Sequence, residues 1–262
     1  MKNLIIGSSG FIGRYLCQYL KNLGEDVIEY DIARTSIEDA RYNKLPLDNI
    51  DRVYFLAWKV GGAKYLYDPT TQQEQLNWNI KLLTNVMEQL SHIPFVFASS
   101  QLAEDCDTVY GVIKRLGEVW TNLIGGRTIR FWNIYGPYEE QSIKSHVVAD
   151  FIHQALKKGM INMVTDGNEK RQFIHADDIC NALCKSFDYN SGVYDASSLQ
   201  WNSIYEIAQL VGKHTGCVIM RGQNKGSSLM IENKPRICEA KISLETGIEK
   251  TVRLFQDRNN QV

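Results

Sequence analysis

Hydrophobic and polar residues follow two alternating patterns along the first half of the chain. Short, nearly continuous apolar runs at 52–57 and 94–99 are typical of strands in a sheet that is covered on both faces. Between them lies a segment with apolar residues at helical spacing, which we interpret as a helix packed on the core or on a second subunit: Leu76, Ile80, Leu83, Val86, Met87 and Leu90. The whole pattern predicts strands at 2–6, 26–31, 52–57, 94–99 and 127–133, and helices at 11–23, 75–91 and 109–124. This alternation predicts an α/β fold with a doubly wound parallel sheet.

A glycine-rich turn joins the first predicted strand to the first predicted helix. Gly7, Gly10 and Gly13 stand where a chain turns tightly, approaches a pyrophosphate and packs a helix on a strand. The helix that follows would direct its free N–H groups at the phosphates. Asp31 ends the second predicted strand, where a carboxylate binds the ribose hydroxyls of NAD and repels the 2′-phosphate of NADP. Arg34 would attract such a phosphate, so the sequence favours NAD and does not exclude NADP.

The pattern loosens after residue 137. Helices are predicted at 144–158, 176–187, 203–214 and 243–255, with a turn at 166–168, and the stretch 227–241 is interpreted as a loop over the site. We therefore expect a Rossmann-type domain at 1–136 that also takes in part of 137–200. Residues from about 137 to 262 would form a smaller C-terminal substrate-binding lobe, interleaved with the first domain.

The composition limits the classes of partner that we expect the protein to bind. The 262 residues carry a net charge of −1 without a block of basic residues, which argues against binding to nucleic acid. No apolar run approaches the roughly 20 residues that span a bilayer, so we expect a soluble protein without a membrane partner. The six cysteines form no CxxC pair and have no metal-site spacing, and no signal-peptide pattern precedes the first strand. We expect reduced thiols, no metal and a cytoplasmic location.

Three polar residues are candidates for catalysis. Tyr110 and Lys114 stand four apart at the start of a predicted helix, so their side chains project from one face. A nearby ammonium favours the phenolate of a tyrosine, whose ordinary pKa is about 10. Ser100 ends the fourth strand, at the sheet edge where parallel α/β proteins bind ligands, whereas Ser99 points to the other face. Tyr110 would then act as an acid or base on a substrate oxygen held by Ser100.

With these motifs, the chain resembles the extended short-chain dehydrogenases/reductases of the NAD-dependent epimerase/dehydratase family, whose members act on nucleotide sugars. The resemblance covers nearly the whole sequence, and its motifs are the N-terminal glycines, Asp31, Leu56-Ala57, Asn79, Ser99-Ser100, Tyr110-x-x-x-Lys114 with Glu118, residues 130–137, Gly167 and residues 171–178. It implies that Tyr110 is the general acid/base, that Lys114 holds the cofactor ribose and lowers the pKa of the tyrosine, and that Ser100 orients the reacting sugar oxygen.

The resemblance also implies binding residues and an assembly. The cofactor, NAD, would contact Gly7, Ser9, Gly10, Phe11, Ile12, Gly13, Asp31, Leu56, Ala57, Ser99, Tyr110 and Lys114. A nucleotide-diphosphate sugar would contact Ser100, Asn133 and Arg171, and Arg236 is a candidate second phosphate ligand. A homodimer would form through helices 75–91 and 109–124.

Two departures from the family pattern bear on the reaction. Only Gln101 to Val109 separate the serine from the tyrosine, so the sugar pocket must be rebuilt or more open. Gln101-Leu102 replaces the Asp-Glu pair of sugar 4,6-dehydratases, which disfavours dehydration. The leading hypothesis is a nucleotide-sugar epimerase that oxidises its substrate to a keto sugar and reduces it again. The alternatives are an NAD(P)H-dependent reductase of 4-keto-6-deoxy sugar nucleotides and, more distantly, a dinucleotide-sensing protein without turnover.

Other residues have plainer interpretations. His146, at a predicted helix start, is interpreted as a cap or surface residue rather than a second acid/base. Asp177 and Asp178 are interpreted as acids that stabilise a helix N-terminus rather than as metal ligands. Trp58 and Trp201 lie near predicted loops, where they would be able to stack on a base or a sugar, but packing is their default assignment.

Overall fold

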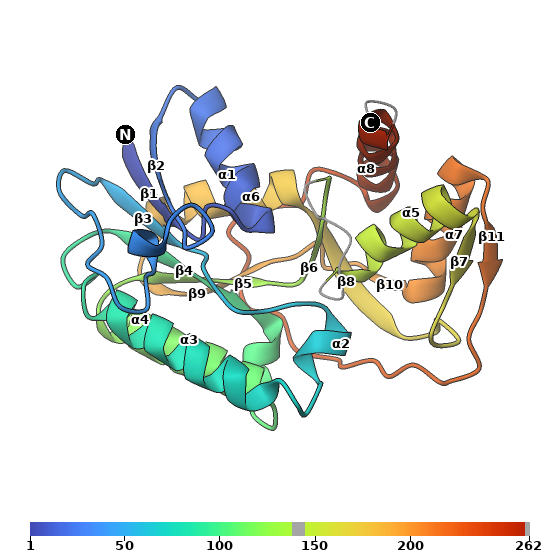
Figure 1. The fold of residues 1–262 in the computed structure, drawn as a ribbon, viewed down its shortest axis with the longest axis horizontal. Coiled ribbons are helices and arrows are strands. Elements are labelled where there is room, and N and C mark those ends of the chain that lie inside the picture. Colours follow the sequence, from blue (N-terminus) through green and yellow to red (C-terminus); the bar gives the residue numbers. More distant parts are fainter. Residues whose placement is uncertain (138–144, 260–262) are drawn as a thin grey trace.

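A parallel six-stranded sheet forms the larger half of the protein (Figure 1). The computed structural model describes residues 1–137 and 145–259. The strand order is β2 (Asp26–Tyr30), β1 (Lys2–Ile6), β3 (Arg52–Phe55), β4 (Phe95–Ser100), β5 (Arg127–Phe131) and β9 (Gly192–Ala196), and every neighbouring pair is parallel. The chain order reverses between β1 and β3, and ligands of such sheets bind beyond the strand ends at that point. The predicted doubly wound parallel sheet is confirmed.

Helices cover both faces of this sheet. Helices α1 (Phe11–Asn22) and α6 (Ala176–Lys185) lie on one face, and α3 (Gln72–Met87) and α4 (Val109–Leu123) lie on the other (Figure 1). The residues of β1 show how the sequence fills both layers. Leu4 and Ile6 join the core that includes Leu83 of α3, whereas Ile5 joins the core that includes Leu16 of α1. Successive residues of a strand face opposite sides of the sheet, so an unbroken apolar run is buried on both faces.

The second half of the chain builds another core beside the sheet. Helices α5 (Val147–Lys158), α7 (Ile204–Thr215) and α8 (Leu244–Asn259) pack around apolar residues that include Phe151, Ile207 and Ile248. Two small sheets complete it: β10 (Trp201–Ser203), β8 (Lys170–His175) and β6 (Asn133–Tyr135) form one, and β11 (Val218–Met220) and β7 (Met160–Asn162) form the other. A capping box of Ser203 and Glu206 starts α7, and Gly216 ends it in the left-handed conformation (φ 71°).

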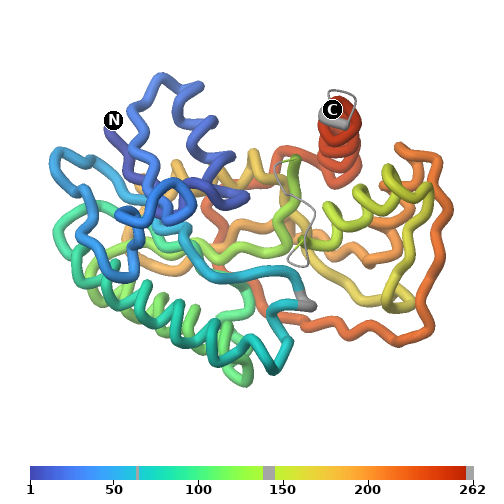
Figure 2. Tube along the Cα trace, in the orientation of Figure 1, coloured from blue at the N-terminus to red at the C-terminus, as the bar shows by residue number. Residues whose placement is uncertain are grey.

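Short helices lie between these elements, and one long segment joins the two halves. The short helices are the α-helix α2 (Ala63–Leu66) and the 3-10 helices η1 (Ser36–Glu38), η2 (Gln101–Glu104) and η3 (Ser186–Asp188). After β11 the chain runs back along one side of the molecule to the large sheet (Figure 2). There the side chain of Asn233 and the backbone N–H of Lys234 both donate to the Asp195 carboxylate of β9, each at 2.9 Å.

Several details differ from the sequence-based expectations. The strand expected at 127–133 ends at Phe131, and Asn133 begins β6 in a different sheet. Strands β7, β8, β9, β10 and β11 were not predicted. The helix expected at 75–91 spans 72–87, and Leu76, assigned to its buried face, is 39% exposed. Residue 144, at the start of the helix expected at 144–158, lies outside the described residues, and α5 begins at Val147. No helix in the described part of the chain is long and apolar enough to cross a bilayer.

Candidate active site

The glycine-rich turn is required by close packing. Gly7 has φ +95°, and a Cβ built on it would lie 2.4 Å from the backbone nitrogen of Ala57. A Cβ on Gly13 would lie 2.0 Å from the carbonyl oxygen of Gly7, so α1 approaches the turn closely only because residue 13 is glycine. Gly10 is the N-cap of α1, and no side chain caps that end. The free N–H groups of α1 are therefore available to an anion such as a pyrophosphate.

Asp31 lies beside this turn. Its carboxylate accepts the backbone N–H of Ser9 at 3.0 Å and that of Ala33 at 2.8 Å, which fixes its orientation. Each carboxylate oxygen can accept a further hydrogen bond, as the hydroxyls of a ribose would require. Asp31 and Gly10 line the same cavity. The helix end, the glycines and the carboxylate therefore fit NAD.

The cavity has a volume of about 670 Å³ and lies across the carboxyl ends of the strands. At one end it is lined by the glycine-rich turn and Asp31, and in the middle by Leu56, Ala57, Ser99, Ser100, Tyr110 and Lys114. Its other end is lined by residues of the second half of the chain, among them Asn133, Arg171, Trp201, Leu229 and Ile231. One space thus joins a dinucleotide site, the proposed catalytic residues and a second binding region.

Ser100 and Tyr110 meet in the middle of the cavity. The loop between them is held tightly, because a Cβ on Gly111 would lie 1.9 Å from the carbonyl oxygen of Asp105. The Ser100 hydroxyl donates to Gln101 Oε1 at 3.1 Å and accepts the N–H of Leu102 at 3.2 Å. Burial raises the pKa of Tyr110 to about 12, although its hydrogen bond with Ser100 counteracts the shift. Tyr110 therefore carries its proton at neutral pH.

Lys114 lies behind Tyr110 and is only 4% exposed. Its ammonium donates to the carbonyl oxygen of Ala98 at 2.6 Å and lies 3.7 Å from the centroid of the Trp58 ring. Burial lowers the pKa of Lys114 well below its ordinary value, and the carboxylate of Glu118 opposes this shift. Lys114 and Tyr110 project from the same face of α4, as predicted, with the ammonium 5.8 Å from the centroid of the tyrosine ring.

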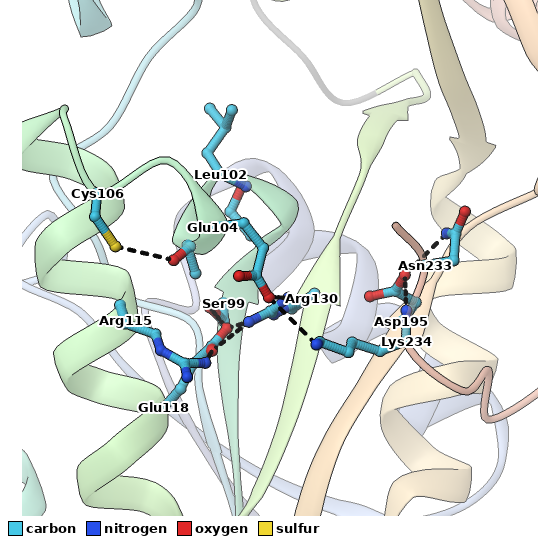
Figure 3. A network of polar contacts seen from close by, with 12 residues as sticks. Ser99, Leu102, Glu104, Cys106, Arg115, Glu118, Arg130, Asp195, Asn233 and Lys234 are labelled. Carbon is cyan, nitrogen blue, oxygen red and sulfur yellow. Dashed lines mark hydrogen bonds and ion pairs between the residues drawn. The ribbon is translucent and has the colours of Figure 1, made fainter. Parts of the chain in front are cut away.

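A buried ion network holds the floor of the site in place (Figure 3). Arg130 of β5 donates from Nη2 to Glu118 Oε2 and from Nε to Glu118 Oε1, each at 2.7 Å, and from Nη1 to Glu104 at 2.6 Å. Ser99 donates to the same Glu118 carboxylate at 2.6 Å, so its side chain faces away from Ser100, as expected. Glu104 belongs to η2, which begins directly after Ser100. The network therefore fixes η2, which directly follows Ser100, to both β5 and α4.

Polar and aromatic groups line the far end of the cavity. The Arg171 guanidinium donates to the carbonyl oxygens of Lys170 at 2.7 Å and Ser227 at 2.8 Å. The Asn133 amide donates to the carbonyl oxygen of Gln172 at 3.1 Å. Trp132 and Trp201 form an edge-to-face pair with 5.7 Å between centroids. This end combines a fixed guanidinium with flat apolar walls.

Some candidates lie elsewhere. Arg236 is not among the residues that line the cavity; its backbone forms a bridge with Asp195 at the edge of β9. Ser9 contributes a backbone N–H to Asp31 rather than a cavity wall. His146 is the N-cap residue of α5, as expected, but it also lines the cavity. Asp177 and Asp178 lie in the first turn of α6, and the described residues contain no group of acidic, histidine or cysteine side chains arranged for a metal.

Sequence reasoning missed several lining residues. Asp39, Arg41 and Trp78 line the same cavity as Asp31. Arg41 pairs with the Asp39 carboxylate at 2.6 Å, and its guanidinium lies 3.4 Å from the centroid of the Trp78 ring. Tyr67, directly after α2, is a further phenol in the cavity. Tertiary packing brings these residues together, and no local pattern marks them. For Trp58 and Trp201, a large aromatic side chain beside a predicted loop was the available signal.

Comparisons with known proteins agree with this geometry. The model of the NAD dependent epimerase/dehydratase family matches residues 3–196. A UDP-2-acetamido-2,6-beta-L-arabino-hexul-4-ose reductase of Pseudomonas aeruginosa is 24% identical over 79% of this chain and 55% of its own length. A UDP-N-acetyl-alpha-D-glucosaminuronate decarboxylase of Bacillus cytotoxicus is 22% identical over 98% of both chains. The chain thus spans just over half of the first relative and nearly all of the second.

Solved structures share the fold. The UDP-glucose 4-epimerase of Thermotoga maritima, solved with UDP-glucose, has a TM-score of 0.79 and 20% identity, covering 99% of this chain and 100% of that one. MoeE5, solved with UDP-glucose and NAD, has a TM-score of 0.80 and 21% identity over the same shares. Taken with the family match over residues 3–196, the sequence and fold establish that this chain belongs to the NAD-dependent epimerase/dehydratase family of extended short-chain dehydrogenases/reductases.

Proposed function

We propose that this protein is an NAD-dependent nucleotide-sugar epimerase that oxidises a sugar carbinol to a ketone and reduces it again from the opposite face. One observation carries the proposal: Ser100, Tyr110 and Lys114 line the middle of a single cavity, between the glycine-rich turn and Arg171. A sugar whose phosphates reached Arg171 would present a hydroxyl to Tyr110. Family membership supports nucleotide-sugar chemistry, and the finer reaction is our proposal.

Tyr110 and Ser100 have different roles at the reacting oxygen of the sugar. Tyr110 would act as a phenolate once the charges of Lys114 and oxidised NAD lower its pKa, and it would then take the proton of the sugar hydroxyl while Ser100 holds the same oxygen by a hydrogen bond. NAD, when bound, supplies the hydride acceptor and donor. After the keto sugar rotates so that the opposite face of its carbonyl carbon faces the cofactor site, Tyr110 returns the proton to the same sugar oxygen. Lys114 places a positive charge behind the phenol, and this charge favours the phenolate.

The far end of the cavity suits the nucleotide part of the substrate. Arg171 presents a planar fork of donors that matches phosphate oxygens, and its backbone contacts hold that fork in place. Asn133 and the N-terminal end of α5 at His146 line the same region. We propose that these groups bind the diphosphate, and that the Trp132–Trp201 pair forms part of the wall against the nucleoside.

The position after Ser100 argues against dehydration. A sugar 4,6-dehydratase of this family needs an acid-base pair here to move protons between sugar carbons. Gln101 lines the cavity, and its amide oxygen accepts a hydrogen bond from the Ser100 hydroxyl. An amide cannot serve as the acid that dehydration requires.

A reductase of keto sugar nucleotides is the second candidate. It would use Tyr110, Lys114 and Ser100 for the reductive half of the same cycle. A specific observation favours it, because the relative with 24% identity is a reductase of a keto sugar nucleotide. A dinucleotide sensor is less well supported, since Tyr110 and Lys114 are both retained and both line the cavity.

A substrate panel separates the candidates. UDP-glucose, UDP-galactose, UDP-N-acetylglucosamine and UDP-glucuronic acid would each be incubated with the protein and a trace of NAD, and the products followed by NMR. The epimerase proposal predicts an epimer without net consumption of cofactor. A 4-keto-6-deoxy sugar nucleotide would be offered separately with NADH, where one NADH consumed per product would indicate the reductase. CO₂ release from UDP-glucuronic acid would indicate a decarboxylase. The Tyr110→Phe variant should lose most of its activity in whichever reaction is observed.

A further inference from the structure

The ammonium of Lys114 lies in an enclosure made of aromatic rings and one carbonyl group. The nitrogen is 3.7 Å from the centroid of the Trp58 ring, 4.9 Å from that of Phe97 and 5.8 Å from that of Tyr110. The same nitrogen donates a hydrogen bond to the carbonyl oxygen of Ala98 at 2.6 Å. Trp58 therefore provides the nearest of the three rings to this buried charge.

We propose that Trp58 is a positioning residue, which holds the ammonium of Lys114 charged and in place through the face of its indole ring. The inference rests on the proposed function, in which Lys114 acts on Tyr110 and on the cofactor ribose. A cation over an indole face is stabilised by the ring quadrupole, most strongly where water is excluded. Lys114, at 4% exposure, meets that condition.

The orientation of the indole supports this role. The Trp58 Nε1 atom is buried and has no hydrogen-bond partner among the described residues. Burying an unpaired donor is unfavourable, so another contact must favour this orientation. The ring packs against Phe97 at 5.7 Å and Phe55 at 6.3 Å between centroids, and its face is turned to Lys114. Packing with the two phenylalanines fixes the ring, and the ammonium occupies its electron-rich face.

The charged group around Lys114 is already engaged with other partners, so the contact with the Trp58 ring is important for the ammonium. From its own helix, the charged group that faces Lys114 is Glu118, which is already paired with Arg130 of β5 and Arg115 of α4. Strand β4 contributes the Ala98 carbonyl and the Phe97 ring, and the segment after β3 contributes Trp58. One ammonium proton goes to Ala98 and the indole face covers a second direction. A third donor is then left for the cofactor ribose or the Tyr110 side.

The test is the titration of Lys114 in protein without substrate. Lysine labelled with ¹³C at Cε would be followed by NMR against pH, with the Lys114 signal assigned through Lys114→Arg. Tryptophan carrying one, two or three ring fluorines would replace Trp58 alone, because fluorine weakens the ring quadrupole with little change in shape. The proposal predicts that the acid dissociation constant of the ammonium rises with each fluorine, about tenfold over the series.

Matched substitutions complete the test. Trp78 also carries cations on its ring, with Arg41 at 3.4 Å and Lys59 at 4.4 Å, so the same fluorinated series at position 78 should leave Lys114 unchanged. Trp58→Phe should give an intermediate shift and Trp58→Leu the largest, with thermal unfolding measured to confirm that each variant is folded. A Lys114 titration that does not respond to fluorination at position 58 would overturn the proposal. Because no substrate is present, a failed epimerase assay leaves this result intact.

Discussion

Tyr110 is the residue on which the proposed chemistry depends. Burial raises the pKa of its phenol to about 12 even though the hydrogen bond with Ser100 partly offsets the shift, so the phenol stays protonated at neutral pH. Lowering a tyrosine pKa by one unit requires about 1.4 kcal/mol of preferential stabilisation of the phenolate. The nearby Lys114 ammonium and the positive charge of oxidised NAD are the available sources. Membership of an NAD-dependent family agrees with the NAD predicted from Asp31.

Replacing Tyr110 by Phe removes the hydroxyl that exchanges the proton. General acid–base groups contribute about 10²- to 10⁴-fold to rate, so kcat should fall by that factor while NAD affinity changes little. Turnover and NAD binding, the latter by calorimetry, are the two measurements. The exposed Tyr42→Phe variant is the control and should behave as the wild type. Full turnover by Tyr110→Phe would contradict the assigned role.

The titration of Tyr110 should also appear in stability. Its pKa in the folded protein, about 12, lies above the ordinary value of about 10. The neutral form is therefore favoured by folding, and the resulting stability is present below pH 10 and is lost as pH rises toward 12. Urea unfolding across this range should show a smaller loss for Tyr110→Phe than for the wild type, by at most about 3 kcal/mol. Equal losses in the two proteins would contradict the raised pKa of Tyr110.

Much of the candidate site follows from the sequence, but its shape does not. The glycines, Asp31, Ser100, Tyr110 and Lys114 were predicted, because each stands at a fixed offset from a strand end or along one helix. Residues such as Trp58 and Tyr67 reach the cavity through loops whose course depends on tertiary packing. Arg236 shows the opposite case, since its sequence position suggested a phosphate ligand and the fold places its backbone against β9.

Among the elements, β5, α4 and η2 depend on one buried arginine. Arg130 is 1% exposed and pairs with Glu118, which is equally buried, and with Glu104. Arg130→Met would leave the Glu118 carboxylate buried without its main partner, which should lower the free energy of unfolding by about 3–5 kcal/mol. Arg253→Met, at an exposed pair with Glu249, is the matched control and should change it by less than about 1 kcal/mol. Denaturant unfolding measures both, and equal small effects would contradict the structural role of the network.

The accuracy of the element predictions depended on length and periodicity. Helices α1, α4, α5, α6 and α7 begin and end within about three residues of the predicted bounds, because each has a long apolar stripe and clear ends. Strands β6, β7, β10 and β11 contain three residues each, too few to establish a period of two. Strand β9 pairs with β5, far away in the sequence, and only that pairing identifies it.

For the whole molecule, an exposed apolar stripe on α4 points to assembly. Val112, Leu116, Val119 and Leu123 lie on one helix face and are 43–76% exposed, and Leu76 of α3 is exposed as well. Contiguous exposed apolar residues mark interaction sites. We therefore retain the expectation of a homodimer through α3 and α4. In such a dimer, the apolar stripe of each subunit would be buried against the other subunit.

Leu116→Glu should weaken that dimer, because it places a charge in the apolar interface. Light scattering should report a dimer for the wild type and a smaller mean mass for the variant. Val218→Glu, at an exposed apolar position on β11, is the control and should remain dimeric. A monomeric wild type would refute the assembly.

In the proposed function, one chain oxidises and then reduces its substrate with a cofactor that it keeps. The most direct measurement is to unfold freshly purified protein and identify the released dinucleotide by mass spectrometry. A self-contained epimerase predicts close to one NAD per chain. Protein that is isolated empty and takes up NADH or NADPH only from solution would contradict the claim and favour the reductase.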